Sequence, residues 1–185
     1  MATLRWSFAG LILLAVWPAW SQEVTSGPEK GKEVPPLKVF DATGPHKEKE
    51  VDYAKERGAK ATVYVFIPAD KWSRPLARFL KTLDEAVPKV GEEAAVVAVW
   101  LTDDPAKAKA YLPVAQDSLQ LQVTALTCFT GDKEGPRGWG INADAHATAV
   151  VTARGKVAAT FGYNSVNETA VPAVRDALRR ARTGK

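Results

Sequence analysis

Cysteine, methionine and histidine are nearly absent from this sequence of 185 residues, which contains one, one and two of them respectively. Because Cys128 is the single cysteine, no intramolecular disulfide can form, and stability must come from packing alone. The two histidines, His46 and His146, lie without a nearby cluster of carboxylates, which is not the composition of a metal site. We therefore expect no metal and no other cofactor.

Strong charge of one sign is missing as well. The formal net charge is +4 at pH 7, which is too small to favour nucleic acid as a partner. The basic residues near the C-terminus fall in a predicted helix, where cations are favourable at the C-terminal end. We expect no nucleic-acid partner.

Residues 1–21 have the pattern of a secretory signal peptide. Arg5 supplies a positive charge, an apolar run begins at Phe8, and the small residues Ala19 and Ser21 follow at the spacing that a signal peptidase uses. A membrane-spanning helix needs about 20 apolar residues, and Pro18 interrupts this run. We predict cleavage after Ser21, no membrane span after cleavage, and a secreted or periplasmic location.

The rest of the chain divides into a short polar segment and one domain. Residues 22–36 are rich in Pro, Gly and charged side chains and show no apolar periodicity, which is typical of a flexible linker. Residues 37–185 are enough for a single domain with one core.

Alternating strand and helix patterns run through this domain. We expect strands at residues 37–42, 50–53, 62–67, 94–104 and 121–128, a hairpin over 146–163, and helices over 73–87, 105–115 and 167–182. Such an order predicts an α/β fold with parallel central strands, helices on both faces of the sheet, and antiparallel strands added by the hairpin at one edge.

One stretch has the features of a redox loop without its cysteines. The sequence VYVFIPADKWSRPLARFL contains a strand, then Trp72 and Pro75, then a helix. It resembles the thioredoxin fold, and in particular the secreted redoxin branch of thiol-disulfide oxidoreductases and peroxiredoxin-like (AhpC/TSA-like) proteins. The resemblance covers residues 35–182 and implies a thioredoxin-like three-layer sandwich. That family carries Trp-Cys-x-Pro-Cys here, whereas this chain has Ser73 and Leu76 at the cysteine positions.

A second stretch, GWGINADAHATAVVTARGKVAATFGY, resembles the strand and hairpin that carry the family's cis-proline. Ala145, His146 or Ala147 occupies that neighbourhood, with His146 in the best register. A cis bond before a residue other than proline costs about 2.5 to 4 kcal/mol, so we expect a trans peptide. In the peroxiredoxin register the reactive position falls near Pro75, which again is not cysteine.

Ser73 has two interpretations. Its side chain can cap the helix that follows, or it can act as a nucleophile, which would need a base within reach. Nothing in the sequence orients His46 or His146 on Ser73, so we favour the cap. In either case a hydroxyl cannot form a disulfide.

These residues predict a redox-inactive binding or scaffold module whose partner is an extended peptide or another envelope protein. The resemblance places the binding groove at six residues: Trp72, Ser73, Arg74, Pro75, His146 and Ala147. Trp139 also borders a loop and could line a groove, whereas Trp100 lies in a strand and is expected in the core.

The alternative is an atypical single-cysteine oxidoreductase or peroxidase that uses Cys128. Such an enzyme needs a partly exposed thiol with a lowered pKa. A lone cysteine between apolar residues is otherwise a small buried hydrophobe. The two possibilities differ in the exposure of Cys128.

Overall fold

The computed structural model describes residues 24–132 and 134–184. The predicted signal peptide and residues 22 and 23 of the predicted linker lie outside this part of the chain. Among the described residues, no helix combines the length and the apolar character needed to cross a membrane.

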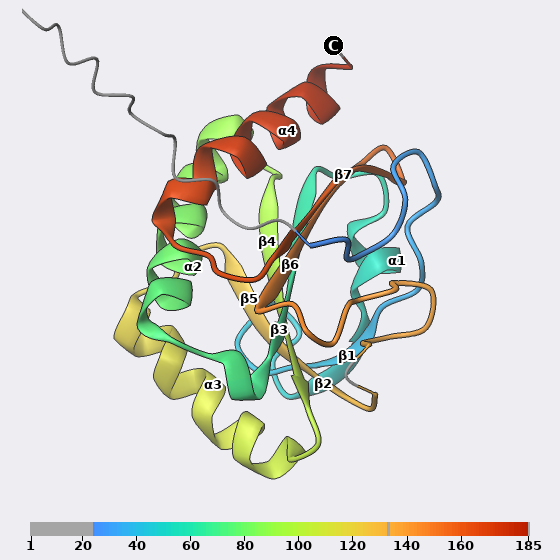
Figure 1. Cartoon of the computed structure of the whole chain (residues 1–185). Coiled ribbons are helices and arrows are strands. Elements are labelled where there is room, and N and C mark those ends of the chain that lie inside the picture. The colour runs from blue at the N-terminus through green and yellow to red at the C-terminus, as the bar shows by residue number, and fades with distance from the viewer. Residues whose placement is uncertain (1–23, 133, 185) are drawn as a thin grey trace, which may run out of the picture.

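Seven strands form one mixed sheet in the order β2-β1-β5-β4-β3-β6-β7. The strands are β1 (Lys38–Asp41), β2 (Lys49–Asp52), β3 (Thr62–Pro68), β4 (Ala95–Thr102), β5 (Thr124–Thr130), β6 (Ala147–Ala153) and β7 (Lys156–Tyr163). The helices are α1 (Tyr53–Arg57), α2 (Arg74–Ala86), α3 (Pro105–Leu119) and α4 (Val171–Thr183). Figure 1 shows the sheet with the long helices on one side.

The three central strands are parallel, as the sequence pattern predicts. β4 pairs in parallel with both β3 and β5, and all seven residues of β3 are buried. A strand covered on both faces has no need of polar alternation, which explains its continuous apolar run. β6 and β7 extend the sheet beyond β3 as an antiparallel hairpin.

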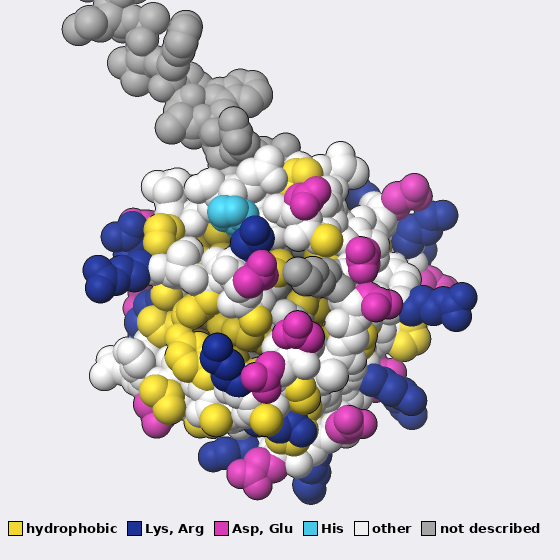
Figure 2. Space-filling view, turned by 60° about the horizontal axis from the view of Figure 1, so that its bottom comes forward, with side chains coloured by type: hydrophobic (Ala, Val, Ile, Leu, Met, Phe, Trp, Pro, Cys, Tyr) yellow, Lys and Arg dark blue, Asp and Glu magenta, His cyan; other side chains and the backbone are white. Residues whose placement is uncertain are grey.

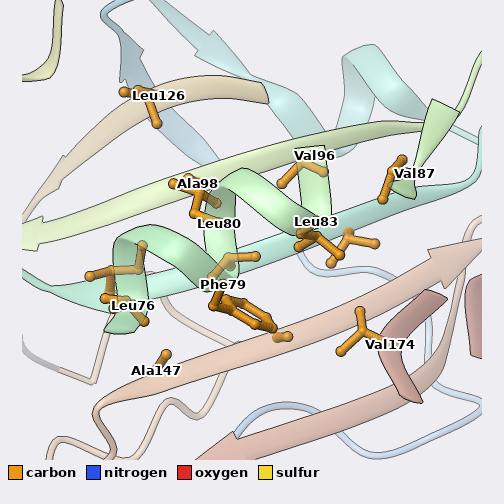
Figure 3. Packing of buried hydrophobic residues seen from close by; sticks show 14 of the residues in the cluster. Leu76, Phe79, Leu80, Leu83, Val87, Val96, Ala98, Leu126, Ala147 and Val174 are labelled. Atoms are coloured by element: carbon orange, nitrogen blue, oxygen red, sulfur yellow. The ribbon is translucent and has the colours of Figure 1, made fainter. Parts of the chain in front are cut away.

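The two faces of the sheet are covered differently. Apolar side chains of α2, α3 and α4 form one cluster with residues of the sheet, and Figure 3 shows α2 placing Leu76, Phe79 and Leu83 against that face. The opposite face is covered by the five residues of α1, by the segment before β1, and by Trp139 and Ile141 of the loop before β6. Helices therefore lie on both faces, with all three long ones on the same side.

The prediction of a flexible linker is wrong for residues 24–36. This segment runs along β7, where the amide of Val24 donates to the carbonyl oxygen of Gly162 at 3.0 Å and the amide of Gly31 donates to that of Val157 at 2.8 Å. The hydroxyls of Ser26 and Thr148 lie 2.6 Å apart. Without this segment β7 would be an open sheet edge with unpaired backbone groups. Residues 24–36 pair with those groups through their own main chain, which does not require apolar side chains.

Two further details differ from the sequence prediction. Helix α3 continues beyond the predicted end at residue 115 to Leu119, and the burial of Leu112 and Ala115 on its inner face holds it against the sheet despite Pro113. The short helix α1 was not predicted. Its start is the N-cap Asp52, whose side chain accepts from the amide of Lys55.

Candidate functional site

The loop between β3 and α2 lies at the carboxyl edge of the parallel strands. β3 ends at Pro68, a 3₁₀ turn covers Ala69–Lys71, and Trp72 and Ser73 lead into α2. Because β4 is parallel to β3, the segment from β4 to α3 reaches the same edge. Ligands of open α/β sheets bind outside the carboxyl ends of the strands, so this edge is the natural place for a site.

Ser73 occupies the N-cap position of α2 but does not cap it with its side chain. Its backbone is extended, with φ −152° and ψ 163°, and no side-chain capping hydrogen bond forms. The carbonyl oxygen accepts from the amide of Ala77 at 2.9 Å, which starts the helix. The predicted side-chain cap is therefore wrong. Ser73 is exposed, and among the described residues no hydrogen bond connects its hydroxyl with His46 or His146, so neither histidine is placed to act as its base.

His146 and Ala147 reach the same edge through the antiparallel pairing of β6 with β3. Phe66 pairs with Thr148, and continuing this register sets His146 level with Pro68. His146 is exposed while Ala147 is buried. None of the described peptide bonds is cis, which agrees with the trans peptide expected here.

The other predicted groove residues differ in exposure. Ser73, Arg74 and Pro75 are exposed, and Trp72 is half-buried. Leu76 is buried in the cluster beneath α2, which also contains Ala147. The edge therefore presents a hydroxyl, a guanidinium and an imidazole above an apolar floor, and it presents no thiol.

Trp72 is held from two sides. Its ring packs on that of Trp100 with centroids 4.8 Å apart, and its indole N–H donates to the hydroxyl of Tyr111 at 2.6 Å. Trp100 comes from β4 and Tyr111 from α3. The loop is thus fastened to the elements that follow it in the chain, and Trp72 does not project freely into solvent.

A cavity of about 510 Å³ opens beside Trp72, on its β4 and α3 side. Its lining consists of Ala69, Asp70, Trp72, Trp100, Thr102, Asp103, Asp104, Lys107, Ala108 and Tyr111. Figure 2 shows this end of the molecule, where hydrophobic side chains gather next to acidic and basic ones. Three carboxylates face one ammonium group around the aromatic wall, so the cavity carries a net negative formal charge.

The three carboxylates of this cavity differ in whether they already accept a hydrogen bond. Asp104 caps α3 by accepting from the amide of Lys107 at 3.0 Å. Asp70 and Asp103 are exposed, and within the described part of the chain neither makes a side-chain hydrogen bond or an ion pair. These two carboxylates are therefore available to a ligand.

Cys128 does not meet the conditions for a reactive thiol. It lies in β5, is 2% exposed, and is paired with Phe40 on one side and Trp100 on the other. Burial raises the pKa of its thiol, an effect that the positive charge of Lys109 only partly offsets. A thiol that is both covered and less acidic than usual is a poor nucleophile.

Trp139 is buried as well, so the prediction that it could line a groove is wrong. It is fully covered, its ring lies 5.1 Å from that of Tyr64, and its indole N–H donates to the carbonyl oxygen of Pro36 at 3.0 Å. Trp100 is in the core, as expected. Among the described residues there is no group of three or more side chains that could hold a metal ion.

Sequence reasoning missed Asp70, Asp103 and Tyr111. A signal for the first two existed, because each follows a buried strand of the parallel sheet and so reaches its carboxyl edge. No sequence pattern marked Tyr111 as a site residue. It lies on a helix with weak amphipathic character, and its hydrogen bond with Trp72 joins residues 39 positions apart.

Comparison with known proteins gives the fold. No family model matches the sequence, and no curated protein matches it. A DsbF homologue from Corynebacterium diphtheriae superimposes with a TM-score of 0.60 at 18% identity, over 87% of this chain and 96% of that one. A putative thiol:disulfide interchange protein DsbE from Chlorobium tepidum gives 0.56 at 18% identity, over 85% and 97%.

A third solved structure, the exposed lipoprotein thioredoxin Etrx1 from Streptococcus pneumoniae, gives a TM-score of 0.55 at 13% identity, over 77% of this chain and 98% of that one. Redoxins thus match nearly the whole described domain. The chain has the thioredoxin-like α/β fold that its sequence predicted.

Proposed function

We propose that this chain is a redox-inactive thioredoxin-like binding module that works outside the cytoplasm and holds an extended peptide of a partner protein. In this proposal Ser73 and Leu76 stand at the positions of the two redox cysteines. The inherited contact surface consists of Trp72, Ser73, Arg74, Pro75, His146 and Ala147.

The single observation that supports this proposal most strongly is the burial of the only thiol of the chain beneath this edge. Ser73 is exposed at the start of α2, whereas Cys128 is 2% exposed within β5. Disulfide exchange requires an accessible thiolate. The edge therefore retains the exposure of a contact surface without the group that would make it an oxidoreductase.

The chemistry of the edge suits a peptide. Backbone polar groups and exposed side chains from two loops lie beside each other where β3 ends and β6 begins. Arg74, at the N-terminal end of α2, adds a cation that would favour a peptide carboxylate. Binding at such a surface is reversible, because the hydroxyl of Ser73 cannot form a disulfide with a thiol of the ligand.

The location is supported by the predicted signal peptide and by the names of the similar structures, one of which is an exposed lipoprotein. Edman sequencing of the chain secreted by its host is expected to begin at Gln22. An intact N-terminus in the cytoplasmic fraction would contradict this part of the proposal.

The activity part is tested by comparing the protein with Cys128→Ser for reduction of hydrogen peroxide and of a peptide disulfide, driven by dithiothreitol. We expect no turnover above the uncatalysed rate in either protein. Turnover that disappears in Cys128→Ser would move the active centre to β5 and overturn the proposal.

The binding part is tested with peptides selected from a random displayed library. Titration of a selected peptide into the ¹⁵N-labelled protein is expected to shift the amides of Ser73, Arg74 and His146. An Arg74→Glu variant should lose most of this response, while Arg137→Glu, at an exposed loop position outside the proposed groove, should not. Shifts confined to another surface would contradict the proposed site.

A further inference from the structure

The cavity beside Trp72 has a composition that the proposed peptide groove does not explain. Of the proposed groove residues only Trp72 lines it, and the remaining lining comes from the β3–α2 turn, the end of β4 and the first turns of α3. Its volume of about 510 Å³ is that of a site for a side chain or a small ligand. Its walls are aromatic and its border is acidic.

The aromatic wall is fixed before any ligand arrives. Trp72 is half-buried, packs on Trp100 at 4.8 Å, and is oriented by its hydrogen bond to Tyr111. Trp100 is itself 3% exposed. A planar wall whose orientation is already set loses little conformational entropy when a ligand stacks on it.

The border supplies negative charge that the described part of the protein does not neutralise. Asp70 and Asp103 are exposed and have no hydrogen-bonded or ion-paired side chain among the described residues, and Asp104 adds a third carboxylate. Lys107 is the only cation of the lining. An aromatic face with carboxylates at its border attracts a cation through the ring quadrupole and through direct ion pairs.

From this complementarity we infer that the cavity binds the arginine side chain of a partner polypeptide. A guanidinium is planar, stacks on aromatic rings and pairs with carboxylates through two hydrogen bonds, whereas an ammonium is a strongly hydrated point charge. A polypeptide is the fitting source because Trp72 belongs to both this cavity and the proposed peptide surface. The inference therefore rests on the proposed function and adds a chemical requirement to it.

The test uses N-acetyl-arginine amide as the probe and N-acetyl-citrulline amide, which has nearly the same shape and no charge, as its control. Both are titrated into the ¹⁵N-labelled protein at low salt, and the indole N–H resonance of Trp72 is followed. The indole N–H of Trp139, buried on the other face of the sheet, serves as the internal reference. We expect saturable shifts at Trp72, about tenfold tighter binding of the arginine probe than of the citrulline probe, and no shift at Trp139.

Three exposed variants give the charge dependence of binding. Asp70→Asn and Asp103→Asn should each weaken binding of the arginine probe about threefold, and Lys107→Gln should strengthen it by a similar factor, because it removes a competing cation. Asp117→Asn, on α3 outside the cavity, should change nothing. Circular dichroism of each variant verifies that the fold is retained.

Equal binding of the two probes, absence of any Trp72 shift, or shifts that the Asp70→Asn and Asp103→Asn variants leave unchanged would each overturn the inference. None of these results would affect the proposed function, because a selected peptide without arginine could still shift Ser73 and His146. Conversely, an arginine-specific response at Trp72 without any peptide response at Ser73 would leave the cavity assignment intact and remove the groove.

Discussion

The indole ring of Trp72 packs on that of Trp100 with centroids 4.8 Å apart and planes inclined by 56°. This contact joins the loop after β3 to the neighbouring parallel strand, and Tyr111 adds a hydrogen bond from α3. The loop that precedes α2 is thereby part of the packed structure. Its conformation depends on residues that follow it by 28 and 39 positions.

Replacing Trp72 by alanine should therefore destabilise the whole domain. Loss of the aromatic pair and of part of the buried ring area is expected to lower the free energy of unfolding by roughly 2 kcal/mol. Urea denaturation measures the change. Asp70→Ala, two residues earlier and exposed without partners in the described chain, is the control and should stay within about 0.5 kcal/mol of the parent. Equal effects would show that Trp72 contributes no packing.

The position of Ser73 gives a prediction about acidity. In a Cys128→Ser background, the thiol of Ser73→Cys would lie at the N-terminal end of α2, where unpaired amides and the helix dipole stabilise a thiolate. The thiol of Ser118→Cys would lie near the C-terminal end of α3, where the dipole has the opposite effect. Iodoacetamide labelling across pH should therefore give a lower pKa for the first thiol than for the second.

The two variants are matched because both positions are exposed. If the two thiols titrate together, or in the reverse order, the first turn of α2 does not stabilise a thiolate at position 73. The proposed correspondence of Ser73 to a redox cysteine would then lose its electrostatic support.

Asp84 connects α2 to the start of β5, and its removal should be costly. The carboxylate is 2% exposed and accepts from the amides of Gln122, Val123 and Thr124 at 2.9 Å each, and from the hydroxyl of Thr124 at 2.7 Å. Asp84→Ala leaves three backbone donors without their acceptor.

Because unsatisfied buried donors cost about 1 to 3 kcal/mol each before relaxation, we expect Asp84→Ala to lower the free energy of unfolding by about 3 kcal/mol or more. The neighbouring Glu85→Ala removes only an exposed ion pair with Lys81 and should change it by less than about 1 kcal/mol. Urea denaturation of both variants compares them, and equal losses would contradict this role of Asp84.

The sequence was sufficient for the parts of the fold that depend on local pattern. The buried run from Thr62 to Ile67 predicts the central strand because a strand covered on both faces has to be apolar throughout. The hairpin around Arg154 and Gly155 follows from the turn between two β runs. The resemblance of the loop after β3 also predicts a candidate site at this end of the strand, and that assignment stays a prediction.

The missed features depend on contacts between distant residues. The segment before β1 has the composition of a linker, yet its amides bind β7 through the main chain, which leaves no side-chain signal. The cavity needs Tyr111 from α3 as well as Asp103 from the end of β4, and the contact of Tyr111 with Trp72 joins residues 39 positions apart. Likewise the exposure of Cys128 could not be decided until its neighbours on the sheet were known.

High pH should destabilise the protein through two buried tyrosines. Burial is the main cause that raises the pKa of Tyr53, with its hydrogen bond to Asp41 next, and burial also raises the pKa of Tyr64. Both phenols stay protonated in the folded state at pH values where the unfolded chain, with pKa values near 10, releases these protons. The stabilisation that these two protonated tyrosines provide is therefore fully present below about pH 10 and is lost as the pH rises above it.

Each tyrosine should contribute a slope of up to about 1.4 kcal/mol per pH unit in this range. Urea denaturation between pH 8 and pH 11, from about two units below the unfolded pKa to about one unit above it, measures it. The Tyr64→Phe variant should show a shallower slope than the parent. An unchanged slope in this variant would mean that Tyr64 ionises in the folded protein as it does in the unfolded chain.

The close approach of the N-terminal segment to β7 gives a direct test of the corrected linker assignment. A Cβ atom added at Gly162 would lie 2.1 Å from the carbonyl oxygen of Val24 and 2.8 Å from the Cβ of Ser26. Since contacts under 3.0 Å cannot be tolerated against backbone, Gly162→Ala should displace this part of the segment. Hydrogen exchange followed by NMR reports the displacement at single amides.

In the parent protein the amides of Val24 and Gly27 donate to carbonyl oxygens of Gly162 and Gly140 and should exchange slowly. In Gly162→Ala both should exchange at least about tenfold faster, because they open without the rest of the domain. The amide of Gly31, which bonds further along β7, should remain protected, and Ala158→Ser should leave all three unchanged. Unprotected amides at these positions in the parent would restore the flexible linker that the composition indicates.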